Sequence, residues 1–330
     1  MPSRNSSTDL LYTLQLDASD EKAGDGAIKE GHATWNFVSS NDYTIGLRLG
    51  QGKSNYGFEG TGSSSGTFFV ETSAATKGFA NTYSRGAWLI GRGMESRLRW
   101  TLGAMNSDAA GGLGTTYVDR GAEAANGDNE PSYTATINFD PVGKMVEGNN
   151  ESFRQGAFGE GTHGTIGIGV ARGNGAHARG SDRGNRVEST SLSANTAWNI
   201  DSLQLMGEYF MRTDDLQSEE ADKEEPSGFV VSGTYVLPKA EKSDMRWGIG
   251  LRYSMVENDD GDVAGIQYLD GLRGIEGTVG EATEITAVLN AFYHQHSAKT
   301  QLEVTMQDVD PDGGDSTTNY IVTLAFQVAF

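Results

Sequence analysis

Charged side chains recur at alternate positions of segments that are otherwise small or apolar. The basic ones are Arg48, Arg97, Arg99, Arg212, Arg246, Arg252 and Lys299, and the acidic ones are Glu208, Glu284 and Glu303. Successive side chains of a strand point to opposite faces, so the pattern places these charges together on one face of a sheet. On the inner wall of a pore, such charges set ion selectivity at a constriction. The alternative is that they solvate a wet wall and pair with one another.

The segments that carry these charges alternate with the period of a β-strand. In 245–255, for example, Ile249 and Leu251 lie opposite Arg252. Fourteen segments show the pattern: 10–17, 31–39, 44–50, 81–92, 96–105, 133–140, 165–172, 191–198, 203–212, 229–237, 245–255, 285–294, 299–308 and 320–330. They are about ten residues long, the length with which a tilted strand crosses a bilayer. The sequence therefore predicts an all-β protein, a transmembrane antiparallel up-and-down β-barrel of 14 strands, with residues 1–330 as one domain.

Composition excludes several other classes of protein. The 330 residues contain no Cys, which removes disulfide scaffolds and thiolate sites, and no stretch reaches the roughly 18 apolar residues of a membrane helix. With 45 acidic and 25 basic side chains the net charge is -20, which repels the phosphates of nucleic acid. Nucleic acid is therefore not expected as a partner.

The second face of the strands decides between a soluble sandwich and a membrane barrel. That face carries Arg, Glu, Gln, Thr and Gly over the whole strand, as the wall of a wet lumen does. Aromatic residues gather near strand ends, where interfacial girdles form, as at Tyr253, Tyr293 and Tyr320. The bacterial outer membrane is the expected location. The segment 1–5 has no apolar stretch of a signal peptide, so we expect the numbering to begin at a processed form.

Short and long connections alternate along the chain, which sorts them to opposite ends of a barrel. The 30-residue connection 51–80 is expected to fold into the lumen, where Lys53, Glu59, Glu71 and Lys77 would narrow the path; the alternative is an external flap. The connection 141–163 falls on the short-turn side although it is long. We expect it to contain a bulge or a small hairpin.

Acidic residues concentrate in the long connections, and most such runs are solvated surfaces. At an outer mouth they would meet divalent cations that bridge to lipopolysaccharide. Asp308, Asp310 and Asp312 match the first half of a calcium loop, but its twelfth position is Asn319 and not a bidentate Glu. A Ca²⁺ site there is a hypothesis. His294 and His296 supply too few ligands for zinc, and no motif brings Ser, His and carboxylate together, so no enzyme is predicted.

Several motifs resemble those of bacterial outer-membrane porins. The alternating end 320–330 resembles their closing strand, and Gly57-Phe58-Glu59, Ser63-Ser64-Ser65, Phe69-Val70-Glu71, 247–254, 280–286 and 289–293 are similar to the phosphate-selective porin O/P family. Thr72 stands where that family has Arg in its F-x-E-R stretch, which weakens a transfer of phosphate selectivity. The resemblance implies a homotrimer, and it gives 16 strands as the alternative count.

The sequence thus predicts a water-filled outer-membrane channel for passive diffusion of small hydrophilic solutes or ions. Its lipid and lipopolysaccharide surroundings are the other expected partners, and no cofactor beyond the possible calcium is expected. Seven cations face three carboxylates at the inward positions, and these lie closer to the path than the screened loop acids, which favours weak anion preference. The alternative is a structural or adhesive barrel with a plugged lumen and acidic loops that bind a partner.

Overall fold

The structure is a computed structural model of the whole chain, and one antiparallel sheet accounts for most of it. It describes residues 9–17, 27–40, 42–62, 66–80, 83–106, 131–146, 153–159, 161–176, 186–216, 223, 225–239, 245–257, 279–311 and 315–328. The sheet has 14 strands, and each strand pairs with the next along the chain. The predicted all-β class and strand count are therefore confirmed, and the count of 16 is not.

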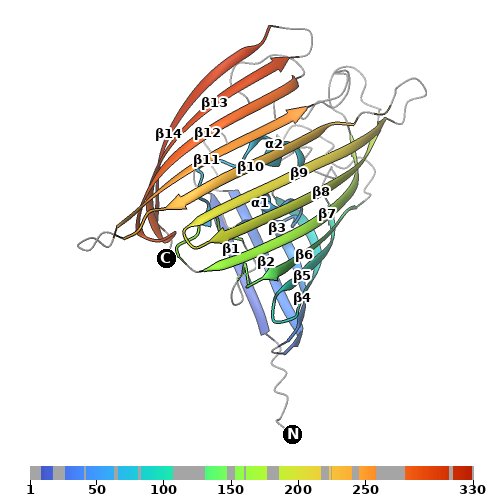
Figure 1. Ribbon diagram of the computed structural model, residues 1–330. Helices are drawn as coiled ribbons and strands as arrows, with labels where there is room; N and C mark the ends of the chain where they lie inside the picture. The colour runs from blue at the N-terminus through green and yellow to red at the C-terminus, as the bar shows by residue number, and fades with distance from the viewer. Residues whose placement is uncertain are drawn as a thin grey trace.

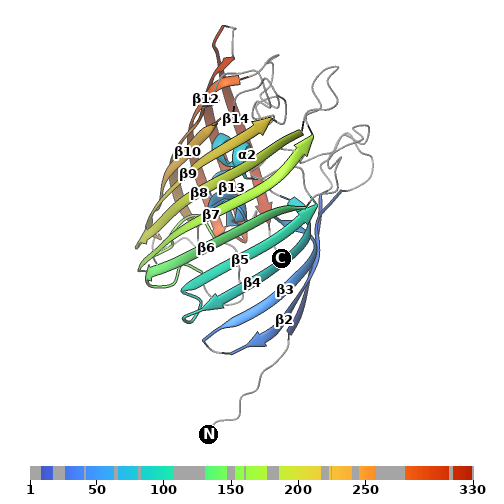
Figure 2. The ribbon, with the colours of Figure 1, turned by 90° about the vertical axis from the view of Figure 1, so that its right-hand side faces the viewer.

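The strands are β1 (Asp9–Asp17), β2 (Ala27–Ser39), β3 (Thr44–Lys53), β4 (Tyr83–Gly93), β5 (Leu98–Asn106), β6 (Ser132–Val142), β7 (Thr162–Ala176), β8 (Arg186–Ile200), β9 (Leu203–Leu216), β10 (Ser227–Val236), β11 (Arg246–Glu257), β12 (Val279–His294), β13 (Ala298–Pro311) and β14 (Thr317–Val328). The sheet curves round a central space, and β1 and β14 are the two ends of its strand order (Figures 1 and 2). Up-and-down order with tight turns at one end is the topology of outer-membrane barrels.

Strand boundaries differ from the predicted ones mainly at the end with long connections. The predicted 165–172 and 191–198 become Thr162–Ala176 and Arg186–Ile200. The added residues at that end, such as 173–176, lack the apolar alternation on which the prediction rests, although the backbone pairing continues through them. At the other end, β5 begins at Leu98 because Ser96 has a φ of 73° and belongs to the turn. Ala329 and Phe330, the end of the predicted 320–330, lie outside the described residues.

The outer surface of the sheet is apolar. Leu102 is 50 % exposed and Leu251 66 % exposed, whereas the next residue, Arg252, is 3 % exposed. Trp247 and Ile249 also face outward, as the alternation predicts. An exposed apolar belt on the outside with buried charge on the inside is the arrangement that a hydrocarbon surrounding stabilises.

Two short helices lie inside the curve of the sheet (Figures 1 and 2): α1 (Phe58–Thr61) and α2 (Ala74–Phe79). We call residues 54–80 the inner segment. Phe79 stacks on Phe210 of β9 with ring centroids 5.4 Å apart, and both side chains are fully buried. The largest apolar core thus lies between the inner segment and the inner face of the wall. No helix among the described residues is long and apolar enough to cross a membrane.

We expect the two faces of β5 to respond differently to charge. Leu102→Lys should destabilise the barrel by roughly 2 to 4 kcal/mol, because it places an ammonium group in lipid near the middle of the strand. The matched variant Thr101→Lys, which faces inward, should cost less than about 1 kcal/mol. Urea unfolding in lipid vesicles measures both values. Equal losses at the two positions would contradict a lipid-facing belt.

Candidate functional site

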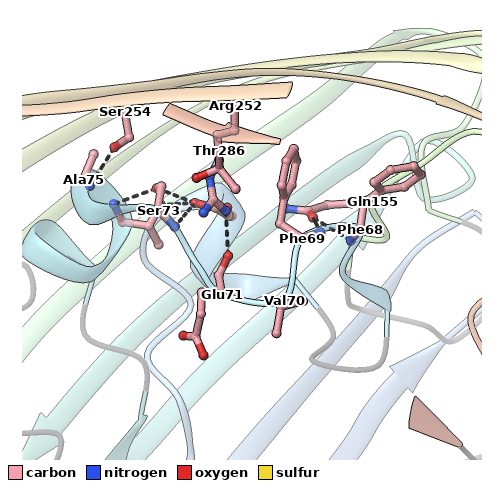
Figure 3. A network of polar contacts seen from close by, with 12 residues as sticks. Phe68, Phe69, Val70, Glu71, Ser73, Ala75, Gln155, Arg252, Ser254 and Thr286 are labelled. Atoms are coloured by element: carbon pink, nitrogen blue, oxygen red, sulfur yellow. Dashed lines mark hydrogen bonds and ion pairs between the residues drawn. The ribbon is translucent and has the colours of Figure 1, made fainter. Parts of the chain in front are cut away.

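A buried ion pair joins the inner segment to the wall. Arg252 Nη1 of β11 lies 3.1 Å from Glu59 Oε1, and the two side chains are 2 % and 1 % exposed. The same Nη1 donates to the carbonyl oxygen of Glu71 at 2.6 Å, and the guanidinium lies over the ring of Phe69, 4.6 Å from its centroid (Figure 3). One wall residue therefore holds the inner segment at points on both sides of residues 63–65.

Glu59 also organises the inner segment itself. Its Oε2 accepts hydrogen bonds from the hydroxyls of Ser73 and Thr76, each at 2.6 Å, and from the backbone N–H of Ser73 at 3.2 Å. Ser73 in turn caps α2, because its Oγ accepts from the backbone N–H of Thr76 at 3.1 Å. The Glu59 carboxylate of α1 thus positions the first turn of α2 through its hydrogen bonds to Ser73 and Thr76.

Wall carboxylates bind backbone N–H groups of the inner segment. Glu208 accepts from Phe58 and, at 3.1 Å, from Glu59; Glu284 accepts from Ala74 at 2.8 Å; Glu303 accepts from Val70 at 2.7 Å. All three wall carboxylates are buried. Backbone donors that have left water need partners, and a carboxylate is a strong one.

Carbonyl oxygens of the inner segment accept hydrogen bonds from amide and ammonium groups of the wall. Phe68 O accepts from Asn290 Nδ2 at 2.9 Å and from Gln301 Nε2 at 2.8 Å, while Lys299 Nζ donates to Thr67 O. Lys53, at the end of β3, donates to Gly60 O at 3.2 Å and also to Gly62 O. These lumen charges therefore hold a folded chain as well as lining the wall.

A second stretch, residues 153–159, enters the lumen from the short-turn end. Gln155 Oε1 accepts from the backbone N–H groups of Phe68 at 2.8 Å and Phe69 at 3.4 Å (Figure 3), and Gln155 N donates to Gly66 O. Arg246 Nη1 donates to Phe158 O at 2.9 Å. The connection 141–163 was expected to hold a bulge or a small hairpin. It contributes a stretch that contacts the inner segment. The pairing of β6 with β7 also changes register between Phe139 and Val142, as a bulge does.

Arg97 and Arg99 lie at the short-turn end of β5. Arg99 forms a two-point ion pair with Asp140, at 2.6 and 2.8 Å, and the Asp140 side chain is fully buried. Arg97 lies in the turn and donates to the carbonyl oxygens of Asp140 and Pro141 at 2.9 and 2.8 Å. Its guanidinium lies over Phe139. Asp140, which the sequence pattern did not single out, balances one of the two charges.

The other predicted site residues occupy different surroundings. Arg48 Nε donates to Thr34 Oγ1 at 3.2 Å on the inner face of β2 and β3. Arg212 is fully buried with its guanidinium over the ring of Phe79. The Glu71 side chain is 60 % exposed and pairs with Lys77 at 3.1 Å. It is thus the most exposed predicted acid of this set.

An open cavity remains between the inner segment and the wall formed by β4 to β8. It is lined by Asn55, Gly57, Phe58, Thr61, Ile90, Gly91, Arg92, Arg99, Trp100, Thr101, Thr136, Asn138, Ser193 and Asn195. The sequence analysis missed Arg92, Asn138 and Asn195 as site residues, although alternation places all three on the inner face. A search for charged residues alone would not find the two asparagines.

Two of the three predicted calcium residues lie on the outer face of β13. Asp308 and Asp310 are exposed, and Asp308 Oδ1 accepts from the hydroxyl of Thr318 at 3.1 Å. Asp312 lies outside the described residues, as does most of the acidic stretches 214–225 and 257–262. Among the described residues, no group of three or more His, Cys, Asp or Glu side chains could hold a metal ion.

The fold is similar to that of solved outer-membrane proteins. The channel DcaP of Acinetobacter baumannii matches with a TM-score of 0.53 at 13% identity, over 97% of this chain and 96% of that chain. A loop-deletion mutant of OmpT, an outer membrane protein of Vibrio cholerae, gives 0.52 at 13% identity, over 97% and 85%. The trimer form of OmpT folded in vitro gives 0.50 at 12% identity, over 98% and 84%.

At this identity the likeness shows the fold, that of an outer-membrane β-barrel. No protein-family model matches the chain, and no curated protein sequence matches it. The resemblance to the phosphate-selective porin O/P family therefore stays a prediction from the motifs that carry it.

We expect the Arg252–Glu59 pair to control how firmly the inner segment is held. Glu59→Gln or Arg252→Gln leaves one buried charge without its partner, a change that costs about 3 to 5 kcal/mol in other proteins. Trypsin should then cleave after Lys77 faster than in the parent protein. The double variant should recover part of the protection.

The control for that experiment is Glu188→Gln, since Glu188 pairs with Arg172 where the side chains are 32 % and 64 % exposed. Such a pair contributes about 1 kcal/mol or less. If cleavage after Lys77 were as slow in Glu59→Gln as in this control, the pair would not hold the segment.

We also expect a buried histidine at the short-turn end to make stability depend on pH. His296 is 6 % exposed between the rings of Phe158 and Phe292. Burial, with smaller contributions from the charges of Lys299 and Arg154, lowers its pKa from 6.5 to about 3. As the pH falls, this histidine takes up a proton in the unfolded chain before it does so in the folded protein. Its contribution to the free energy of unfolding is therefore constant above pH 6.5 and decreases below it by up to about 1.4 kcal/mol per pH unit.

His296→Gln should remove the part of the pH dependence of the free energy of unfolding that this histidine causes between pH 6.5 and pH 3. His294→Gln, at an exposed position of the same turn, should keep the parent slope. Urea unfolding as a function of pH compares the three proteins. Identical slopes in all three would show that His296 takes up its proton equally in the folded and unfolded states.

Proposed function

We propose that the protein is a bacterial outer-membrane channel for passive diffusion of small hydrophilic solutes or ions, without chemistry on them. The observation that carries the proposal is the polar cavity between the inner segment and β4 to β8. It lies behind a wall whose outer surface is apolar, as at Leu102. The inner segment narrows the lumen from the opposite side, which is how a fixed constriction selects solutes by size and charge.

Weak anion preference follows from which charges reach the cavity. Arg92 and Arg99 line it, and none of its described lining residues is a carboxylate. The wall acids Glu208, Glu284 and Glu303 accept hydrogen bonds from the inner segment. Asp140 offsets Arg99, so the preference is weak. At low salt the acidic loops act over a longer distance, and we expect the preference to shift toward cations.

A second candidate is a structural or adhesive barrel with a plugged lumen. It is favoured by the number of wall groups that bind the inner segment and by the entry of residues 153–159 from the other end. In that case the acidic loops would bind a partner and the lumen would not conduct. The measurement of conductance separates the two functions.

The expected surroundings are part of the proposal. The porin resemblance, with OmpT seen in a trimer form, supports a homotrimer of this chain. Lipid at the apolar belt and lipopolysaccharide near the outer rim are the proposed contacts. The likeness to the phosphate-selective porin O/P family supports transport of small anions, although Thr72 departs from its motif.

The purified barrel in a planar bilayer should conduct, and a salt gradient should give reversal potentials of weak anion preference. Arg92→Gln should abolish that preference because it removes a cation from the cavity. Arg85→Gln is the control, since Arg85 is exposed on the other face of the same strand. A parent barrel that inserts but does not conduct would establish the plugged alternative. Cation preference at every salt concentration would overturn the proposed selectivity.

A further inference from the structure

The 153–159 stretch is anchored to the wall through Phe158. The ring of Phe158 meets the ring of Phe292 of β12 and the imidazole of His296 edge to face, with centroids 5.1 and 5.2 Å apart. Arg246 of β11 lies over the same ring, 5.9 Å from its centroid, and donates to the carbonyl oxygen of Phe158. One aromatic side chain therefore holds the stretch, and a histidine forms part of its surroundings.

The other contacts of the stretch are few, and they link it to the lumen. Its N–H groups at Gln155, Gly156 and Gly159 donate to the inner segment and the wall at 2.8, 2.7 and 3.1 Å. Phe153 packs on Phe58, which lines the polar cavity, with ring centroids 4.3 Å apart. The stretch contains neither helix nor strand. It can therefore leave its position without breaking the pairing of the strands.

Two glycines at the end of the stretch give its backbone freedom to turn. Gly159 and Gly161 have φ of 90° and 89°, a region that favours glycine. A Cβ at either position would meet no other group closer than 3.9 Å. The backbone conformation, and not close packing, therefore requires glycine at these two positions.

His296 lies where a positive charge is unfavourable. It is in the turn between β12 and β13, is 6 % exposed, and contacts the rings of Phe158 and Phe292. These surroundings replace the water that would solvate an imidazolium. The position suits a neutral imidazole better than a charged one.

The charged groups around His296 add to this effect because they are all positive. They come from the stretch, β11 and β13, and they are Arg154, Arg246 and Lys299. The other titratable group of the turn, His294, is exposed. No carboxylate in the described part of the chain forms an ion pair with His296.

Removal of the stretch would change the proton affinity of this histidine. Burial first, and then Lys299 and Arg154, lower its pKa to about 3, while the backbone of Gln155 acts weakly in the opposite direction. When the stretch leaves, both the burial by Phe158 and the charge of Arg154 are lost. The pKa of His296 then returns toward 6.5.

We propose that the 153–159 stretch is an acid-sensitive gate at the short-turn mouth of the lumen, where protonation of His296 releases Phe158 and the stretch turns outward at Gly159 and Gly161. Above pH 6.5 the histidine is neutral in both positions and the closed one is kept. Below it, the open position binds a proton that the closed one excludes, so the open population rises by up to about tenfold per pH unit. Short turns of outer-membrane barrels face the periplasm, so the gate responds to periplasmic pH. Only its effect on current rests on the proposed channel function.

Hydrogen exchange measured by mass spectrometry on the barrel in detergent tests the gate without any current. The N–H groups of Gln155, Gly156 and Gly159 exchange when the stretch leaves its partners. After correction for the intrinsic effect of pH on exchange, their opening should increase about 30-fold from pH 7.5 to pH 5.0. Peptides of β5 and β6 are the internal reference and should show no such increase.

Three variants assign the increase to one side chain. His296→Gln and His296→Phe both remove the titrating group, so the opening should be the same at the two pH values. The Phe variant keeps an aromatic ring beside Phe158, which covers the case in which Gln itself loosens the stretch. His294→Gln, at the exposed position of the same turn, is the matched control and should show the parent increase.

An equal increase in both His296 variants, no increase in the parent, or an equal increase in the β5 and β6 peptides would each overturn the gate. In a planar bilayer, the parent and His294→Gln should carry more current at pH 5.0 than at pH 7.5, and the His296 variants should not. A conducting parent with equal current at both pH values would also overturn the gate. Exchange of the expected pattern in a barrel that carries no current would support the gate and overturn the channel function.

Discussion

The interior of this barrel is governed by one requirement, that a chain folded inside the lumen must find partners for its backbone groups. The inner segment has little regular structure of its own, so few of its N–H and C=O groups are paired within it. The wall supplies the missing partners through carboxylates, amides, Lys299 and above all Arg252, which joins Glu59 and the carbonyl of Glu71. An unmet buried backbone group costs as much as a lost hydrogen bond, which explains why so many wall charges serve the segment.

This requirement divides the lumen into two unequal halves. On the side of β9 to β13 the inner segment packs against the wall with aromatic rings such as Phe68, Phe79, Phe210 and Phe292, and the space is filled. On the side of β4 to β8 the cavity remains, because Gly167 and Gly169 reduce the volume of the wall and Asn55 and Thr61 face it from the inner segment. The filled half holds the inner segment in place, and the open half keeps the polar cavity.

The charge of the whole molecule and the charge of the path have different origins. Most of the net charge of -20 comes from acids in the long connections, whereas the cavity is lined by Arg92 and Arg99. Screening by salt reduces the influence of the distant charges more than that of the near ones. The net charge of the whole chain therefore says little about the charge at the cavity, which the register of β4 and β5 sets.

The sequence alone determined where most strands lie and which way their side chains face, because the two-residue period is a local property that needs no knowledge of the fold. It favoured 14 strands and left 16 as an alternative, which the sheet itself decided. Leu251 and Arg252 were assigned to opposite faces on that ground. Only the tertiary structure decided what the inward charges contact. Glu59 and Arg252 are 193 residues apart, and Gln155 reaches Phe68 from a connection that alternation describes poorly. Such contacts depend on how a segment without periodicity folds inside the curved sheet, and no local pattern encodes that.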